Sequence, residues 1–196
     1  MWMTVESWST DQEREALLRG LKAGGTDGLV KAMRDAVSVP VTVKHRIGLD
    51  ANEDYGFVRD FIGIVAAAGC EVFIVHARNA VLKGLSPKEN REVPPLRYDV
   101  VHRLKREFPE LVFVANGGLA DWPAIERELE NADGVMVGRA AYHNPWFLAD
   151  VDRRLFDDEG PPLSRAGVIE ALLPYVDAQR AQGVPVRAVT RHVLGL

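Results

Sequence analysis

Four short runs of apolar, mostly β-branched residues constrain the fold of this chain more than any other feature. They occupy residues 39–44, 71–78, 111–118 and 134–140. Each run is continuously apolar rather than alternating between apolar and polar residues. That pattern is typical of strands covered on both faces, as in a parallel sheet. We therefore predict four buried parallel strands.

Helical patterns lie between these runs, so strands and helices alternate along the chain. Residues 54–69 carry apolar side chains at helical spacing, and Gly69 is predicted to cap the C-terminal end of that helix. Residues 98–108 carry a second helical pattern. A third helix is predicted to begin with Asp121 as its N-cap and Pro123 in its first turn. Strict alternation predicts an α/β fold with right-handed crossovers. The side chains predicted to face the core are Phe57, Phe61, Ile64, Val65 and Ala68 in the first helix and Val101, Leu104 and Phe108 in the second, residues 98–108.

Residues suited to chemistry stand at the C-terminal end of each predicted strand, at positions 44–46, 76–78, 116–118 and 138–139. Both (β/α) barrels and open α/β sheets build their active sites at this end of their strands. We predict a TIM (β/α)8-barrel type of fold rather than a doubly wound sheet, because no G-x-G-x-x-G motif follows the first strand. Four βα units make half of such a barrel.

Two further regions flank the four βα units. The segment DDEGPPLS, residues 157–164, indicates a linker, and two amphipathic helical patterns follow it. The beginning of the chain shows no strand and only one modest helical pattern. We predict three regions: an atypical N-terminal segment at residues 1–28, the half barrel at residues 29–156, and the start of a partial α-helical domain at residues 163–196.

Charge and composition limit the classes of partner. The formal net charge is −4, so contact with nucleic acid requires a local basic patch. No apolar run approaches the roughly 20 residues that a membrane-spanning helix needs. The single cysteine, Cys70, excludes an intrachain disulfide and suits a reducing compartment, and the first residues lack the order of a signal peptide. We expect a cytoplasmic protein with no membrane partner and no metal site.

Two glycine-containing turns are candidates for a phosphate site. Asn116, Gly117 and Gly118 follow the third strand, and Gly138 and Arg139 follow the fourth. In a barrel, the loops after the last two strands form the usual phosphate site. Glycines let backbone N–H groups approach phosphate oxygens, and an arginine adds a charge-assisted fork. The alternative is that both are ordinary turns and that Arg139 is a surface charge.

Lys44 and His76 are candidates for ligand contacts, since each ends an apolar strand. A buried lysine is costly unless it is paired or has a chemical role. Lys44 could form a Schiff base, as in an aldolase, or place positive charge against the N1 and C2 carbonyl of a flavin. It could also be a structural lysine paired with a carboxylate. His76 is either a hydrogen-bonded structural residue or part of the same ligand site.

The loop after the second strand is rich in basic residues, among them Lys88 and Arg91. Such a run is either a solvated face or a surface for an anionic macromolecule. Cys70 lies at the start of its strand, opposite the end where the site is predicted. It is therefore expected to be structural rather than a nucleophile.

Several long motifs resemble the tRNA-dihydrouridine synthase family, and the GLSPKENR loop resembles its A-type subfamily. The motifs are PVTVKHRIGLD, FIVHARNAVLKGLSPKENREVPPL, VANGG and GVMVGRAAYHNPW, and the likeness extends over residues 29–196. The resemblance implies a flavin-binding TIM barrel followed by a helical tRNA-binding domain. It also implies that NADPH reduces FMN and that the flavin passes hydride to the C5–C6 bond of uridines in the tRNA D-loop, at positions 20 and 20a.

The resemblance also assigns roles to residues of this chain. Lys44 and His76 match flavin contacts of the family, and Lys88 and Arg91 match its tRNA contacts. Arg187 and Arg191 are weaker candidates for tRNA phosphates. The residues that match the FMN phosphate site of the family are Asn116, Gly117, Gly118, Gly138 and Arg139.

The chain also departs from the family pattern. It has no counterpart of the first four strands or of the cysteine that supplies the proton, and Cys70 does not match that cysteine. We expect a fragment that cannot reduce uridine alone and that associates with itself through exposed half-barrel edges. The alternatives are a non-catalytic remnant that binds FMN or tRNA, and a Schiff-base aldolase or sugar-phosphate isomerase that uses Lys44.

Overall fold

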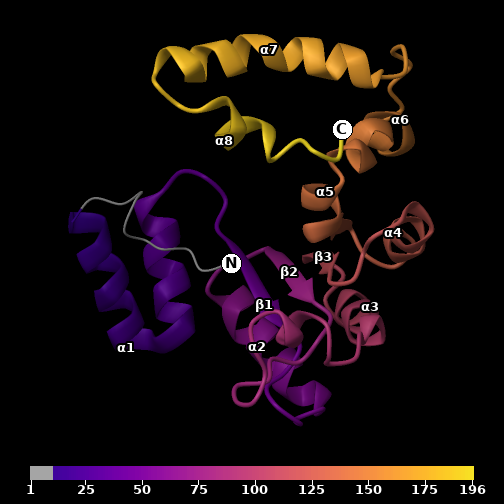
Figure 1. Ribbon diagram of the computed structural model, residues 1–196. Helices are drawn as coiled ribbons and strands as arrows, with labels where there is room; N and C mark the ends of the chain where they lie inside the picture. Colours follow the sequence, from indigo (N-terminus) through magenta and orange to yellow (C-terminus); the bar gives the residue numbers. More distant parts are fainter. Residues whose placement is uncertain (1–10) are drawn as a thin grey trace. The chain divides into compact units, whose positions relative to one another are not determined.

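The computed structural model describes the backbone from residue 11 onward and the side chains from residue 24 onward. The first ten residues of the predicted N-terminal segment, residues 1–28, therefore lie outside the described residues. The chain divides into two compact units, one that extends to Met136 and one that comprises Val137–Leu196 (Figure 1). The predicted domain limits, with a linker at residues 157–164, stay a prediction.

The first unit is built on a four-stranded sheet in which every neighbouring pair is parallel. The strands lie in the order of the sequence. Each crossover therefore advances by one strand in the same direction, as in a (β/α) barrel, whereas a doubly wound sheet reverses direction within the sheet. The strands are β1 (Thr42–Arg46), β2 (Val72–His76), β3 (Val112–Asn116) and β4 (Gly134–Met136).

The fourth strand is shorter than the sequence indicated. β4 ends at Met136, opposite Asn116, the last residue of β3. Residues beyond Met136 have no ladder partner on β3, so the prediction of a strand over residues 134–140 is wrong at its C-terminal end. Arg139 instead begins the short helix α5 (Arg139–His143).

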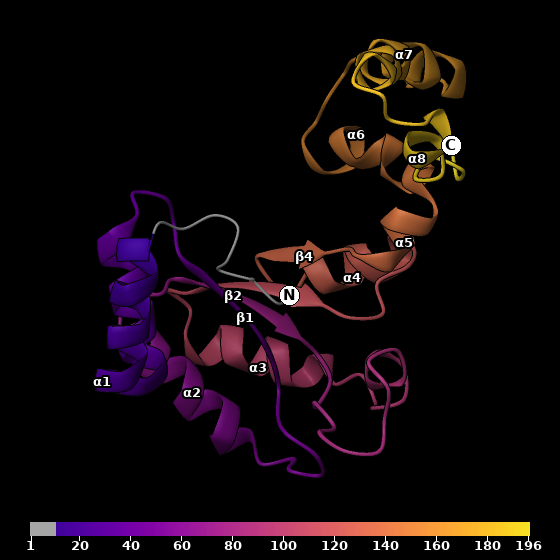
Figure 2. The ribbon, with the colours of Figure 1, turned by 60° about the vertical axis from the view of Figure 1, so that its left-hand side comes forward.

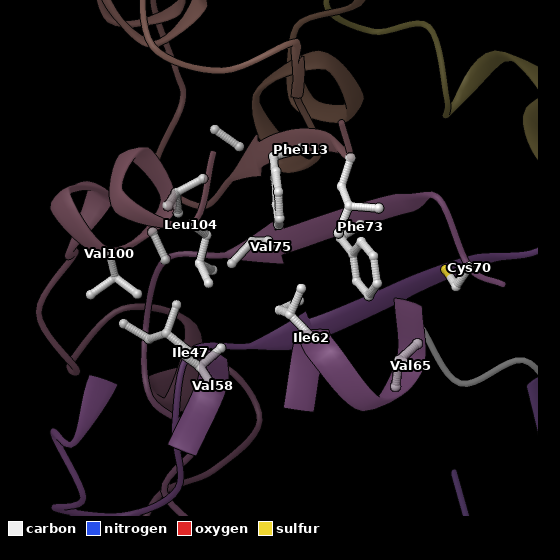
Figure 3. Close-up of a cluster of buried hydrophobic side chains, with 14 of the residues drawn as sticks. Ile47, Val58, Ile62, Val65, Cys70, Phe73, Val75, Val100, Leu104 and Phe113 are labelled. Carbon is white, nitrogen blue, oxygen red and sulfur yellow. The ribbon is translucent and has the colours of Figure 1, made fainter. Parts of the chain in front are cut away.

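One face of the sheet is buried against helices. Phe73, Val75, Phe113 and Ala115 are fully buried on this face. They pack against α2 (Tyr55–Ala67) and α3 (Tyr98–Glu107), which lie on the same side of β1 and β2 (Figure 2). Figure 3 shows the side chains of this core between the strands and the two helices.

The inward face of α2 matches the predicted one only in part, since Val65 is buried and Phe61 and Ala68 pack against the core as predicted. The buried residues are Val58, Ile62 and Val65, whereas Phe57 and Ile64 are 45% and 55% exposed. The helix is apolar over so much of its circumference that spacing alone does not select the face. In α3 the predicted residues Val101 and Leu104 are buried and Phe108 packs against the core, as expected.

The opposite face of the sheet is less well covered than predicted. The residues on this face in β1, β2 and β3 include Thr42, Lys44, Ile74, Val112 and Val114, and none of these is in the buried class. Val112 is 39% exposed. Of the residues on this face in β1, β2 and β3, His76 is the one that is buried, so the prediction that both faces are buried fails toward the amino end of the strands. This face is the one that lines the interior of a barrel.

Helix ends in the first unit follow the local signals of the sequence. Asp121 Oδ1 accepts a hydrogen bond of 2.9 Å from the backbone N–H of Ala124 and caps α4 (Trp122–Leu129), with Pro123 in its first turn. Gly69 adopts a φ of +94° after α2, as predicted for a C-cap. α1 (Asp11–Ala36) lies beside α2 and is kinked at Gly25, which has non-helical torsion angles.

The second unit is helical. It contains α5, the 3₁₀ helix η3 (Pro145–Asp150), α6 (Val151–Leu155), α7 (Arg165–Ala181) and α8 (Val186–Thr190). The second helical pattern predicted after the linker forms α8, which ends at Thr190. Among the described residues, no helix is both long enough and apolar enough to span a membrane.

His45 is a polar residue in the helix-facing layer of the sheet. Its ring lies between those of Phe61 and Phe73, with centroid distances of 5.1 and 6.1 Å. Nδ1 is 2.8 Å from the carbonyl oxygen of Arg46, and because a carbonyl only accepts, Nδ1 carries the proton and donates it. Nε2 is buried and has no hydrogen-bond partner within the described residues. Burial lowers the pKa of His45 to about 4.

The first prediction concerns the stability of the fold toward acid. The pKa of His45 is about 4 in the folded chain and 6.5 ordinarily, so the unfolded state binds the proton more tightly. The contribution of His45 to the free energy of unfolding is therefore fully present above pH 6.5. As the pH falls from 6.5 to 4, the free energy of unfolding decreases by about 1.4 kcal/mol per pH unit. In the His45→Phe variant, the free energy of unfolding measured with urea between pH 7 and 4 should not show this decrease. The exposed His143→Phe should retain it, and equal slopes in both variants would contradict the assignment.

Candidate functional site

The parallel register brings polar side chains from three strands to the carboxyl edge of the sheet. Arg46 on β1 pairs with His76 on β2, and His76 pairs with Asn116 on β3. Lys44 precedes Arg46 by two residues and so lies on the same face. The structure therefore brings Lys44, His76 and Asn116 together on the barrel-interior side, as the sequence predicted.

Lys44 and Asn116 are joined directly by a hydrogen bond that passes over β2. Lys44 Nζ donates to Asn116 Oδ1 at 2.9 Å, and Asn116 Nδ2 donates to the carbonyl oxygen of Met136 at 2.7 Å. Burial, followed by the charge of Arg46, lowers the pKa of Lys44. Its partner is a neutral amide. Within the described residues no carboxylate forms an ion pair with Lys44, so the structure does not support the alternative of a lysine neutralised by an acid.

The glycine turn after β3 is required by the packing of His76 and Leu96. Gly117 and Gly118 have φ values of +110° and +70°. A Cβ on Gly117 would lie 2.8 Å from His76 Nε2, and one on Gly118 would lie 2.5 Å from Leu96 Cδ1. Tyr98 Oη donates to the carbonyl oxygen of Gly117 and holds the turn from α3. These contacts account for both glycines, and their predicted contact with a phosphate stays a prediction.

Gly138 and Arg139 belong to the second unit, Val137–Leu196. Gly138 precedes α5 and has open space where a side chain would extend, and Arg139 is the first residue of that helix. The predicted phosphate site combines these residues with Asn116, Gly117 and Gly118. That combination stays a prediction.

Lys88 and Arg91 lie on the loop between β2 and α3. Both are exposed, and Arg91 ends the 3₁₀ helix η2 (Glu89–Arg91). The neighbouring acid Glu89 is turned into the loop, where Oε2 accepts a 2.8 Å hydrogen bond from the backbone N–H of Ser86. Neither Lys88 nor Arg91 forms an ion pair with a residue that the structure describes. The two cations are therefore available to an anionic partner.

Cys70 lies at the opposite end of the sheet from these groups. Its side chain is fully buried before β2, with Sγ 3.4 Å from the carbonyl oxygen of Val72. Burial raises the pKa of the thiol, which disfavours the thiolate. These observations agree with the expected structural role. Among residues 24–196, no group of three or more His, Cys, Asp or Glu side chains is arranged to hold a metal ion.

The structure adds one residue, Arg46, for which the sequence predicted no role. Arg46 lies on the same face as Lys44, two residues along the strand, and contacts the loop that carries Lys88 and Arg91. The period of two along a strand could have placed Arg46 on this face. Its contacts with backbone carbonyls carry no sequence signal.

The family model for dihydrouridine synthases matches residues 25–196. This chain belongs to the dihydrouridine synthase family. A Pseudomonas putida protein named tRNA-dihydrouridine(20/20a) synthase is 55% identical over 167 residues, which are 85% of this chain and 50% of that protein. The protein of the same name from Escherichia coli K12 is 51% identical over 168 residues, which are 85% of this chain and 49% of that protein. The chain thus spans about half the length of these curated relatives.

The comparisons confirm the resemblance to the A-type subfamily, and they exclude the alternative that the chain is an aldolase or a sugar-phosphate isomerase. The family and the parallel strand order together confirm the half of a TIM-type barrel. Among solved structures, a nitroalkane oxidase from Streptomyces ansochromogenes matches at 18% identity, covering 72% of this chain and 48% of that one. The TM-score of 0.34 is too low to support an inference.

The second prediction separates the clash at Gly117 from its backbone strain. Gly117 and Gly84 both have positive φ, but a Cβ at Gly84 would meet nothing within 4 Å. Gly84→Ala should cost about 1–2 kcal/mol of folding free energy from strain alone. Gly117→Ala should cost roughly a further 1–3 kcal/mol, because it also displaces the His76 ring. Denaturant unfolding and the NMR shift of His76 measure both effects, and equal losses would show that the ring does not pack there.

Proposed function

We propose that this chain supplies the FMN-binding and tRNA-binding parts of a tRNA-dihydrouridine synthase. Such an enzyme reduces the C5–C6 bond of uridines 20 and 20a in the D-loop, with NADPH as the reductant. The observation that carries the proposal is the position of Lys44 and its hydrogen bond to Asn116. This lysine is half-buried at the carboxyl edge of a half barrel and is held by the neutral amide of Asn116 rather than by an acid. The names of the relatives give the reaction.

The residues at this edge fit a flavin mononucleotide. A flavin would supply the hydride for the uracil C5–C6 bond, and its N1 and C2 carbonyl gain negative charge when it is reduced. The positive charge of Lys44 would stabilise this negative charge on the flavin, and the hydrogen bond from Lys44 to Asn116 would fix the direction of the ammonium group. His76 would contact the cofactor from β2. Its phosphate would bind the backbone N–H groups of the glycine turn after β3, together with Gly138 and Arg139.

The tRNA would meet the exposed cations of the loop after β2. The net charge of the chain is −4, so attraction to RNA has to be local, and Lys88 and Arg91 supply it. Arg187 in α8 and Arg191 at its C-cap are candidates for further phosphate contacts from the helical unit. The target base would have to leave the folded D-loop to reach the sheet edge, as bases do in other base-modifying enzymes.

None of the groups assigned to the site is a cysteine, the residue that the family resemblance implies as the proton donor. The single cysteine of the chain, Cys70, is buried at the far end of the strand with a raised pKa. We therefore expect the isolated chain to bind cofactor and tRNA without reducing uridine. A binding module without turnover is the second candidate function, and the buried position of Cys70 away from the site favours it. Self-association through this face stays a prediction.

The third prediction tests the cofactor site. FMN titration followed by flavin fluorescence should show binding that Lys44→Met weakens roughly 10-fold or more, because a charge-assisted contact is lost. The exposed Lys31→Met, which removes the same charge on α1, should leave the affinity unchanged. The purified chain with FMN, NADPH and unmodified tRNA should form no dihydrouridine. Absence of FMN binding would overturn the proposal, and dihydrouridine formation would refute the restriction to binding.

A further inference from the structure

The loop between β2 and α3 is fastened to the first strand by one side chain. Arg46, the last residue of β1, donates from Nη1 to the carbonyl oxygens of Asn79 and Asn90, at 3.0 and 2.9 Å. These two carbonyls belong to the two arms of the loop. The Arg46 guanidinium therefore bridges the arms while its own backbone is held in the sheet beside His76.

The arms are closed on each other at the same point. The side chain of Asn90 accepts a hydrogen bond of 2.9 Å from the backbone N–H of Val81 and donates to the carbonyl oxygen of Val81. Asn79 in turn donates to the carbonyl oxygen of Asn52, at 2.8 Å, in the turn after β1. Arg46 thus holds a closed unit of the loop rather than a single strand of chain.

This closed unit carries the two exposed cations. Asn90 is the central residue of η2, and Arg91 follows it directly. Lys88 precedes η2 as its N-cap and makes no side-chain capping hydrogen bond. The direction in which Lys88 and Arg91 project therefore depends on where the backbone of Asn90 is held.

Two further arginines lie near Arg46, whose acceptors are both backbone carbonyls. Arg78, which donates to the carbonyl oxygen of Pro94 in the same loop, and Arg91 both lie close enough to lower the pKa of Arg46, after the larger effect of burial. Backbone carbonyls orient a guanidinium without neutralising it. Arg46 therefore fixes the loop without its own charge being neutralised by an acid among the described residues.

We propose that Arg46 is a positioning residue that orients Lys88 and Arg91 toward the phosphate backbone of a bound RNA, without touching the RNA itself. This inference rests on the proposed function for the identity of the anion. Both hydrogen bonds use the two N–H groups of Nη1, whose directions are fixed by the guanidinium plane, whereas the N–H groups of a lysine ammonium rotate freely.

The first measurement is independent of RNA. Hydrogen exchange of the Val81 backbone amide, whose acceptor is the Asn90 side chain, should accelerate about tenfold or more in Arg46→Ala and be only partly restored in Arg46→Lys. The amide of Phe73 in β2 should keep its protection, which shows that the fold is intact. Arg59→Ala, which removes an exposed guanidinium paired with Asp60 on α2, should change neither rate. An unchanged Val81 rate in Arg46→Ala overturns the inference.

The second measurement is the affinity for an unmodified tRNA transcript at several salt concentrations. Arg46→Ala should weaken binding roughly tenfold in the otherwise unchanged chain. The same substitution should then be made in a double variant, Lys88→Ala with Arg91→Ala, which lacks both cations. There Arg46→Ala should weaken tRNA binding by less than about twofold and leave the slope of the salt dependence of the affinity unchanged. A direct phosphate contact would instead give additive losses and lower the slope by about one more unit, which overturns the positioning role.

The two measurements separate the inference from the proposed function. If the unsubstituted chain fails to bind tRNA, the proposed function is overturned and the exchange rates alone decide whether Arg46 anchors the loop. If tRNA binds and Val81 exchange is insensitive to Arg46, the proposed function stands and the inference fails.

Discussion

The parallel register of the four strands is the constraint on which the rest of the structure depends. It sets Arg46, His76 and Asn116 side by side at one edge and leaves Lys44 on the same face. A slip of one residue in β1 would exchange the two faces of that strand. It would place Lys44 among the core side chains and His45 at the site. The hydrogen bond from Lys44 to Asn116 holds only in the observed register.

Neighbouring residues of β1 therefore meet opposite demands. His45 is in an apolar layer and stays neutral, because one nitrogen is satisfied by the Arg46 carbonyl and the other has no partner among the described residues. Lys44 points to the other face and can stay charged because an amide oxygen compensates part of its lost hydration. Burial lowers the pKa of both side chains. The two differ in that His45 Nε2 has no hydrogen-bond partner among the described residues, whereas Lys44 Nζ is bonded to Asn116 across the sheet.

The sequence predicted those features that depend on residue type and strand polarity. Lys44 and His76 could be placed at the site because active-site residues of such folds lie at the carboxyl ends of the buried strands. The exposed position of Phe57 could not be predicted, because α2 offers two apolar faces and tertiary packing selects one. The contact of Arg46 with the carbonyl of Asn90 depends on the path of a loop, and any residue supplies a carbonyl. Features of this kind are visible only in the folded chain.

The uncovered face of the sheet restricts what can cover it. Toward the amino end of the strands the face is apolar and includes Val112, so water is a poor neighbour there. Toward the carboxyl end it carries the charges of Lys44 and Arg46, and a purely apolar partner would leave both without hydration. A second copy of the same face brings cations of its own to a shared interior. A partner that covers the whole face therefore has to be apolar over the amino end of the strands and has to supply negative charge over the carboxyl end.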